Sequence, residues 1–460
     1  MNKQNLWSLR LGFSSKEANS IENNFSQFLR SSLDSPIEHA VPEFLSESPK
    51  TTEELKARRI FLKEADADAK KKYIREENEI NLKLKAWWLE KMQQEAFPLR
   101  EKMTCFWHNH YVSTFQKVKV NFWIYQHNQL LRENAFGNFR ELTKQVLKTN
   151  AMVRYLDNTD NKKGKNNENL SRELLELFTL GVGNYTEEDV KNGSKALAGL
   201  GNGDEKAVYR PRFEEEETIT YLGKTGNFKA DDLVDIIFEQ KNIPYLITRK
   251  ILKWFIYDNP KEELVTYYGD FFKKQDFEIK PLLTKIFTEE FNKENAGSKI
   301  KEPLVFIFQV LDELHIKEAK MQMVAHFLKT QGMDLFNQPN VKGWDGGKSW
   351  LTSQILIQRN NAVDLFCKGR TINRKGLPNE EGKTDIELEK ISISLNWPKT
   401  NNKQIIDDLK NRLLFKTDEN LQKDFENILK YDFNPNDPGA ANAVVRLFNA
   451  MAKTPEFQLI

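Results

Sequence analysis

Apolar residues recur at three- and four-residue intervals along most of this chain, which is the spacing of one buried helix face. The clearest stretch is 51–95, which contains neither glycine nor proline and predicts one long helix or a helix pair. Pro98 can open a further helix, because proline is tolerated in a first turn. The pattern predicts more helices at 121–149, 167–180, 186–199, 230–257, 261–275, 278–290, 301–313, 317–330, 347–366, 403–411, 418–429 and 438–453. The expected fold class is therefore all-α, a large multi-helix body.

One segment departs from the helical pattern. The stretch VYRPRFEEEETITYLG contains Thr, Ile and Tyr residues that favour extended structure and a glycine that closes a turn. It predicts a small β-hairpin near residues 208–222 that projects from the helical body. Farther along, the Gly- and Asn-containing stretch 368–385 is the best candidate for a mobile connection.

A chain of 460 residues is long enough for several domains or for one large helical body. We expect one helical domain over 1–460. The alternative is a subdivision into an N-terminal helical part, a hairpin insertion and a C-terminal helical part, at 1–200, 201–229 and 230–460.

Composition narrows the classes of partner. Lys plus Arg number 69 against 67 for Asp plus Glu, so a net charge of +2 provides no field that would hold nucleic acid. No apolar run is long enough to span a membrane, and no signal peptide is visible. As written, the chain is expected in the cytoplasm; a removed leader would instead place it in the periplasm or outside the cell. Its two cysteines are too few for a disulfide framework.

The segment CFWHNHY, residues 105–111, places two of the six histidines one residue apart. At 100° per residue, a helix puts His110 on an apolar stripe and His108 on the opposite side, with Glu101 and Cys105. Two imidazoles that point apart cannot bind one metal ion from one helix. We expect His110 to be a core histidine hydrogen-bonded to a neighbour. The cluster around His108 has the residue types for proton transfer or metal binding, although such clusters are usually inert.

The second polar motif lies in NKKGKNNENLSRELLELFTLGVGNY, residues 161–185. Leucine and phenylalanine residues form the buried stripe of its helix, at Leu170, Leu174, Leu177 and Phe178. The opposite face carries carboxylates and their neighbours at i, i+4 spacing: Glu168, Asn169, Arg172, Glu173 and Glu176. An arginine between glutamates is most often a structural ion-pair network. If packing buries this face, the carboxylates need a metal ion or further cations.

The identity of such a metal is left open by the residues. All-oxygen ligands suit calcium or magnesium, whereas zinc would need His108 or Cys105 to join the site. The sequence identifies no cofactor, and a divalent metal ion is the one that this set of side chains would suit.

A third stretch, NQPNVKGWDGGKSW at residues 337–350, is dense in Gly, Asn, Pro and Trp. Its glycines permit backbone geometries closed to other residues, and its tryptophans offer flat contact surfaces. Because it does not keep the spacing of a P-loop, a rigid loop that packs on the helical body is expected rather than a phosphate cradle. The chain has no GxSxG, no HExxH and no GxGxxG after a strand.

Three segments together resemble the signature blocks of the bacterial domain-of-unknown-function family 1800: PLREKMTCFWHNHY, LDNTDNKKGKNNENLSRELLELFTLGVGNYTEEDV and FNQPNVKGWDGGKSWLTSQILIQRNN. WSLRLGFS near the start and TPEFQL at the end are similar to that family's termini. The resemblance covers nearly the whole chain. It implies no established activity. Members often carry an export signal and are commonly encoded beside proteins similar to the sulfatase and alkaline-phosphatase superfamily, which implies an envelope or extracellular role and a protein partner of that type.

The sequence departs from the family pattern at one place. Family members tend to carry a His-Asp pair before a turn that reads FEEEETITYLG here, and no histidine lies between His127 and His315. A mechanism that requires this pair is therefore in doubt for this chain.

Two hypotheses of function follow. The first is an enzyme or metal-binding protein with one polar site, formed where the 161–176 segment meets the 101–110 helix. Its residues would be His108, His110, Glu168, Asn169, Arg172, Glu173 and Glu176, with Glu173 or Glu176 near one of the two histidines. The second is a non-catalytic helical module that binds a partner protein, in which the polar motifs are buried networks that fix helix packing.

Overall fold

The computed structural model describes residues 1–317, 319–372, 390–430 and 433–460. These residues are overwhelmingly helical and add two small two-stranded antiparallel sheets, which confirms the all-α class with a small β insertion. The stretch expected to be a mobile connection lies largely outside the described residues.

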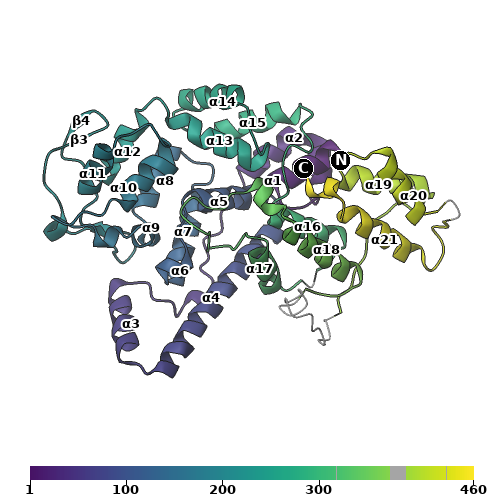
Figure 1. Ribbon diagram of the computed structural model, residues 1–460, viewed down its shortest axis with the longest axis horizontal. Helices are drawn as coiled ribbons and strands as arrows, with labels where there is room; N and C mark the ends of the chain where they lie inside the picture. Colours follow the sequence, from purple (N-terminus) through teal and green to yellow (C-terminus); the bar gives the residue numbers. More distant parts are fainter. Residues whose placement is uncertain (318, 373–389, 431–432) are drawn as a thin grey trace.

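The chain begins in the middle of the molecule, and its two ends lie close together there (Figure 1). The N-terminal amino group donates to the carbonyl oxygen of Leu414, and the backbone of Ile460 pairs with that of Lys299. The first two helices, α1 and α2, span Lys3–Leu11 and Ala18–Leu33.

The glycine-free stretch forms a helix pair, α3 (Thr52–Glu64) and α4 (Ala67–Gln94). Figure 1 shows that α3 and the first half of α4 extend away from the body as an arm. The second half of α4 is buried and packs against α17 (Met321–Thr330).

One end of the molecule holds the elements that follow, from α6 to α12 (Figure 1). Helix α5 (Leu99–His110) starts directly after Pro98, as expected, and runs through the middle of the body. The others are α6 (Phe115–Val118), α7 (Asn121–Glu133), α8 (Phe139–Leu147), α9 (Asn150–Tyr155), α10 (Asn169–Glu173), α11 (Glu187–Ala196) and α12 (Ala230–Phe238).

The remaining helices cover the middle and build the opposite end (Figure 1). Central helices are α13 (Ile243–Phe255), α14 (Glu262–Lys274), α15 (Ile279–Phe291), α16 (Pro303–Glu313) and α18 (Ser353–Cys367). The far end consists of α19 (Asn402–Leu413), α20 (Glu419–Ile428) and α21 (Ala440–Ala452). The buried apolar side chains form a connected cluster that reaches from Leu6 to Ile460.

The predicted hairpin exists, but its strands pair differently from the expectation. β3 (Ile219–Tyr221) pairs with β4 (Lys224–Gly226), and β2 (Val208–Tyr209) pairs instead with β1 (Leu200–Gly201). The turn falls at Leu222 and Gly223, which both have positive φ, so the returning strand lies after the glycine. The residue pattern alone predicts strand β3 and the turn that follows it. Its partner β4 has the sequence KTG, which contains no apolar residue that would indicate a strand.

Candidate functional site

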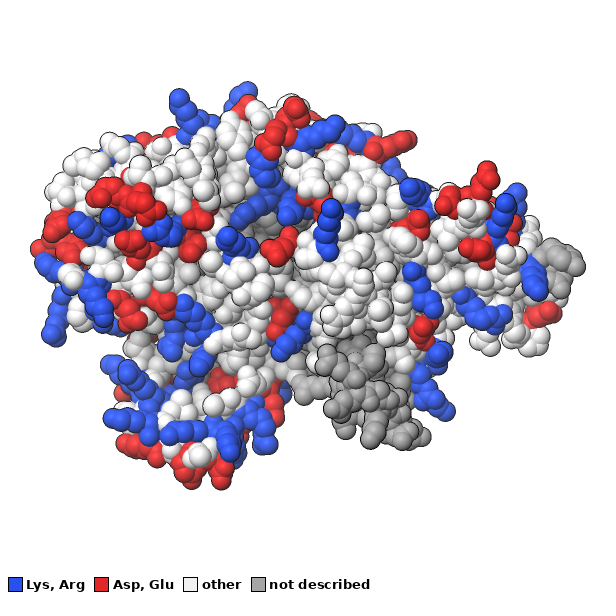
Figure 2. All heavy atoms as spheres, in the orientation of Figure 1, with Lys and Arg blue, Asp and Glu red and all other residues white. Residues whose placement is uncertain are grey.

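His110, the last residue of α5, lines a pocket of about 210 Å³ between α5, α13 and the loop at 342–347. Lysines dominate its charged lining, namely Lys250, Lys253, Lys299 and Lys342, against the two aspartates Asp258 and Asp345. Figure 2 shows this face hollowed below α13, with Lys and Arg side chains gathered along the hollow. The pocket is therefore a polar cavity with an excess of positive charge.

The contact at the centre of the pocket wall joins a lysine to a histidine. Lys250 Nζ donates to His110 Nδ1 over 3.1 Å and to the carbonyl oxygen of Leu177 over 2.9 Å. His110 Nε2 lies 3.1 Å from the carbonyl oxygen of Phe178. A carbonyl can only accept, so Nε2 carries the proton and Nδ1 accepts from the lysine. His110 is therefore a neutral imidazole with both nitrogens bonded.

The two carbonyl groups in this contact come from an irregular helix end. After α10 the chain continues as a π-helical turn over Leu174–Thr179, and it ends at Gly181 with φ of 86°. The last carbonyl groups of a helix have no partner within the helix, so side chains can bond to them. Leu177 and Phe178 supply such carbonyls to the pocket, and the negative end of the helix dipole favours a cation there.

Burial lowers the pKa of both His110 and Lys250. Burial and then the Lys250 ammonium hold the pKa of His110 well below its ordinary value, with only the bond to Phe178 opposing. Burial, and to a smaller extent repulsion from Lys253, lowers the pKa of Lys250 to about 8. The positive charge of this pair is therefore carried by Lys250, which is partly shielded from solvent and has a pKa of about 8.

Among the described residues, no carboxylate hydrogen-bonds or ion-pairs with Lys250. Lys253 likewise donates to a backbone oxygen, that of Asp345, over 3.2 Å. Lys299, by contrast, is 3.2 Å from a Glu302 oxygen. Within the described residues, Lys250 and Lys253 therefore have no carboxylate as a bonded partner.

The loop at 342–347 packs rigidly against the end of α5, as the sequence predicts. Gly343 has φ of 85°, and a Cβ there would lie 2.3 Å from Asn109 Oδ1. The same oxygen accepts from the backbone N–H of Trp344 over 2.7 Å. The close approach requires glycine, and the loop thereby becomes a fixed wall of the pocket.

Two indole N–H groups of the lining are unsatisfied. Trp254 and Trp344 are 7% and 6% exposed, and in the described structure neither Nε1 has a hydrogen-bond partner. One acceptor, Asp258 Oδ1, is also without a bond there. Buried polar atoms normally have partners, so these three unbonded groups are unusual features of the pocket wall.

His108 lies elsewhere, in the core. It is fully buried, its Nε2 donates to the carbonyl oxygen of Ser113 over 3.2 Å, and its ring meets that of His127 edge-on at 5.2 Å. Burial, reinforced by His127, holds the pKa of His108 well below its ordinary value. The sequence favoured His108 over His110 for chemistry, whereas the structure gives the pocket position to His110.

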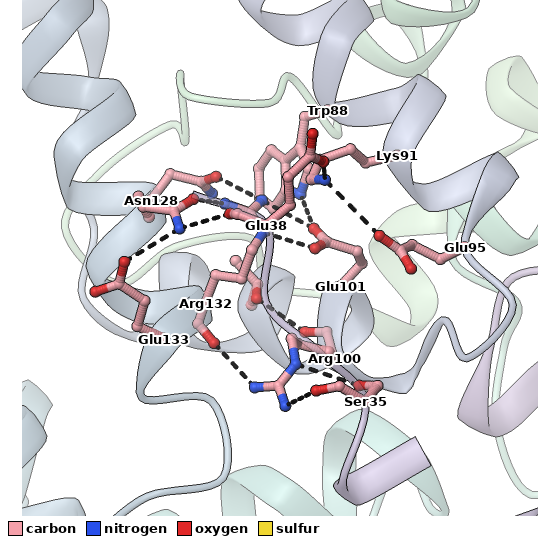
Figure 3. Close-up of polar contacts among 12 residues, drawn as sticks. Ser35, Glu38, Trp88, Lys91, Glu95, Arg100, Glu101, Asn128, Arg132 and Glu133 are labelled. Atoms are coloured by element: carbon pink, nitrogen blue, oxygen red, sulfur yellow. Dashed lines mark hydrogen bonds and ion pairs between the residues drawn. The ribbon is translucent and has the colours of Figure 1, made fainter. Parts of the chain in front are cut away.

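Glu101 and His108 do belong to one polar network, although Asn128 and Arg132 of α7 separate them; Figure 3 shows Glu101, Asn128 and Arg132. Asn128 Nδ2 is 3.4 Å from His108 Nδ1, and Asn128 Oδ1 accepts from Arg132 Nη2 over 2.8 Å. Arg132 then forms a two-point ion pair with Glu101. Cys105 is buried, and burial raises its thiol pKa well above the usual range. The cluster is thus a satisfied buried network.

The acidic motif at 168–176 lies at the surface, where its members take separate partners. Arg172 bonds to Glu168 over 2.9 Å and, with two 2.8 Å bonds, to Glu187, so part of the motif is an ion-pair network. Asn169 is exposed, with Nδ2 3.3 Å from Asp157 Oδ2.

The last two glutamates of the motif are half-buried. Glu176 accepts from the Tyr185 hydroxyl over 2.7 Å. Burial and then Glu176 raise the pKa of Glu173, while Arg172 and the pocket residue Lys342 oppose the rise.

The chain reaches the end of α5 just after the predicted 161–176 segment, at Phe178, and not through the carboxylates that were expected to lie near the histidines. The ring and carbonyl of Phe178 touch His110, whereas the described hydrogen bonds of both imidazoles include no carboxylate. Likewise, no group of three or more His, Cys, Asp or Glu side chains within the described ranges has a geometry that could hold a metal ion. Glu173 interacts electrostatically with the pocket residue Lys342.

Sequence reasoning missed the lysines and one tryptophan of the pocket. Lys250, Lys253 and Trp254 all lie on α13, in the run ITRKILKWF, where lysines at helical spacing indicate only a hydrated face. The one available signal was the Gly- and Trp-rich loop, which was identified as rigid but not as part of a site.

Comparisons with known proteins give one match. A family model described as "Protein of unknown function (DUF1800)" covers residues 6–459. No curated protein and no solved structure matches the chain. Separately, none of the helices in the described part of the chain combines the length and apolar character that crossing a membrane requires.

Proposed function

The chain belongs to the DUF1800 family of proteins of unknown function, and we propose that it binds an anionic small molecule in the pocket formed by His110, Lys250 and the 342–347 loop. The observation that carries the proposal is Lys250. Its ammonium nitrogen faces a cavity, is bonded only to neutral acceptors in the described structure and has a second lysine, Lys253, beside it.

Charge and hydrogen-bond capacity point to the same class of ligand. An anion between Lys250 and Lys253 would relieve the repulsion that lowers the pKa of Lys250. It could also accept from Lys253 Nζ, which in the described structure donates to the backbone oxygen of Asp345. Charge-assisted bonds from ammonium groups to phosphate, sulfate or carboxylate oxygens are among the stronger hydrogen bonds in proteins.

The shape of the pocket limits the size of this ligand. A volume of about 210 Å³ accommodates a small molecule rather than a polymer. The indole rings of Trp254, Trp344 and Trp350 line it, so a ligand with an apolar part beside its anionic group would fit. His110 then acts by holding the lysine in position, because both of its nitrogens are already bonded.

Metal binding, the other form of the first hypothesis, has weaker support. In the described structure Glu168 pairs with Arg172 and Glu176 accepts from the Tyr185 hydroxyl, while Glu173 interacts electrostatically with the pocket residue Lys342. The anion-binding pocket uses one residue of the predicted site, His110, and draws its other groups from α13 and the loop.

Isothermal titration with inorganic phosphate and with sulfate tests the proposal. Wild-type protein should bind at least one of the two ions, and Lys250→Met should weaken that affinity about tenfold or more, since a charge-assisted contact is lost. Lys348→Met is the matched control, because Lys348 is exposed on the same loop but does not line the pocket. Binding that is equal in both variants, in proteins with unchanged circular dichroism, would contradict the proposal.

A further inference from the structure

The α3–α4 arm is unusual in how little of it is buried. Helix α3 has 13 residues, and none is buried; Ile60 and Phe61 are 57% and 50% exposed. It contacts the body through two polar bonds, from Thr52 to Asp204 and from Arg58 to the Lys119 carbonyl oxygen, and through the half-buried Leu55. Helices in proteins gain most of their stability from packing an apolar face, and this one packs almost none.

A groove of about 1100 Å³ separates the arm from the body. Side chains of α3 and α4 form one wall, and residues 115–119, α17 and 334–337 form the other. Along α4 the lining recurs at four-residue steps, through Lys70, Ile74, Asn78 and Leu82. This stripe continues to Lys85 and is about 22 Å long, which is the length of a helix of roughly 15 residues.

Apolar contact area is available on the arm side of the groove. Ile74 lies at the middle of the stripe and is 57% exposed, and Leu62 and Leu82 are half-buried beside it. One exposed and two half-buried aliphatic side chains thus provide the apolar contact that a helix-in-groove complex uses for its anchors.

The charged lining is mostly cationic. It includes seven lysines and arginines: Arg58, Lys70, Lys71, Arg75, Lys85, Lys119 and Lys329. Its three acidic residues are occupied already, since Glu77 bonds to Tyr73, Glu79 pairs with Arg75 and Asp334 pairs with Lys85. Within the described ranges, Lys70, Lys119 and Lys329 form no ion pair. In Figure 2 the arm carries many Lys and Arg side chains.

We propose that this groove binds an acidic amphipathic helix of a partner protein. Such a helix would place leucine-type side chains against Ile74 and Leu62 and carboxylates opposite Lys70, Lys119 and Lys329. Complementary charge of this kind steers association and fixes the register of the helix. The proposal is independent of the anion pocket, with which the groove shares no lining residue.

The apolar side chains of the groove, Leu62, Ile74 and Leu82, distinguish this occupant from a nucleic acid. A phosphate backbone gains nothing from the exposed isoleucine at the middle of the groove, whereas an amphipathic helix can bury it. The chain's net charge of +2 also provides little non-specific attraction for a polyanion.

The test uses the full chain and a fluorescein-labelled peptide of about 16 residues with Leu on one helical face and Glu on the other. Fluorescence anisotropy should show saturable binding. Lys71→Glu/Arg75→Glu should weaken the affinity about tenfold or more, because two groove cations become anions. Lys72→Glu/Lys83→Glu is the matched control, with the same charge change on α4 at exposed positions that do not line the groove. Ile74→Asp should weaken binding as well.

Three outcomes would overturn the proposal. One is no saturable binding of the acidic peptide to wild-type protein. Another is an equal loss of peptide affinity in the Lys71/Arg75 variant and in the Lys72/Lys83 control, because the peptide would then respond only to the overall charge of the arm. The third is tighter binding of a labelled single-stranded oligonucleotide or of anionic phospholipid vesicles than of the peptide, with the same dependence on Lys71 and Arg75.

Discussion

Lys250 donates from Nζ to Nδ1 of His110 over 3.1 Å, so the imidazole is an acceptor and the lysine carries the charge of the pair. The opposite nitrogen of the ring is held by the Phe178 carbonyl oxygen. A residue that sequence pattern identifies as a core histidine thus becomes a support for a pocket cation. An anion in the pocket would therefore contact Lys250, whose pKa is about 8.

Sulfate affinity should therefore depend on pH. The pKa of Lys250 is lowered to about 8 by burial and by Lys253, so the ammonium form dominates below pH 8 and is lost above it. Sulfate keeps its charge throughout this range, so its affinity should fall about tenfold between pH 7 and pH 9. In Lys250→Met the decrease should be much smaller. Titration calorimetry at both pH values measures it; an affinity that is flat in wild-type protein would contradict the assignment.

The buried ion pair between Glu101 and Arg132 should behave as a unit. Both side chains are at most 2% exposed, with bonds of 2.6 and 2.9 Å. Burial alone would raise the pKa of Glu101, but Arg132 lowers it overall. Glu101→Gln leaves a buried guanidinium without its counter-charge and should cost about 3–5 kcal/mol in the free energy of unfolding.

Urea denaturation of two further variants tests whether the stabilising effects of Glu101 and Arg132 depend on each other. Glu101→Leu/Arg132→Met should lose less stability than the two single replacements added together, since no charge is left unpaired. Glu79→Gln breaks an exposed pair with Arg75 and should change stability by less than about 0.5 kcal/mol. Additive losses in the buried pair would show that the two side chains act independently.

The fold follows from sequence largely because helical periodicity is a local property. The glycine-free stretch, the Pro98 start and the turn at Gly223 are set by side chains within a few residues of one another. The partner of a short strand is not local in this sense, and the pairing of β3 with the polar residues 224–226 has no apolar signal in the sequence.

The site was less accessible to sequence reasoning for a physical reason. The helical wheel correctly puts His108 and His110 on different sides of α5, but it does not say which side faces a cavity. That depends on α13, which lies about 140 residues later and brings Lys250 to His110. The π-helical turn that exposes the Leu177 and Phe178 carbonyls is likewise invisible, since its sequence has the ordinary apolar spacing of an α-helix.

The apolar stripe of the 170–178 helix gives a direct test of packing. Leu174 is fully buried, so Leu174→Ala should cost about 2–5 kcal/mol through lost burial and the cavity left behind. Val182 follows on the same segment but is 77% exposed, so Val182→Ala should change stability by less than about 0.5 kcal/mol. Urea denaturation of both variants measures the difference; similar losses would mean that the buried face is misassigned.

The buried histidine His127 should make stability depend on pH. Burial lowers its pKa from 6.5 to about 4, although its bond to the Tyr111 carbonyl oxygen opposes the shift. Because the folded-state pKa is the lower one, only the unfolded chain takes up a proton as the pH falls below about 6.5. Stability from this group is therefore complete above pH 6.5 and is lost progressively toward pH 4.

Between pH 7 and pH 5, wild-type protein should lose about 2 kcal/mol more stability than His127→Gln, which has no group that titrates there. Thr149→Val is the matched control, because it removes the hydroxyl 3.2 Å from His127 Nδ1 and leaves the imidazole in place. That variant should be less stable at both pH values and keep the wild-type pH dependence. Urea denaturation at the two pH values tests the assignment, and an equal pH dependence in wild type and His127→Gln would show that the imidazole is accessible to protons in the folded state.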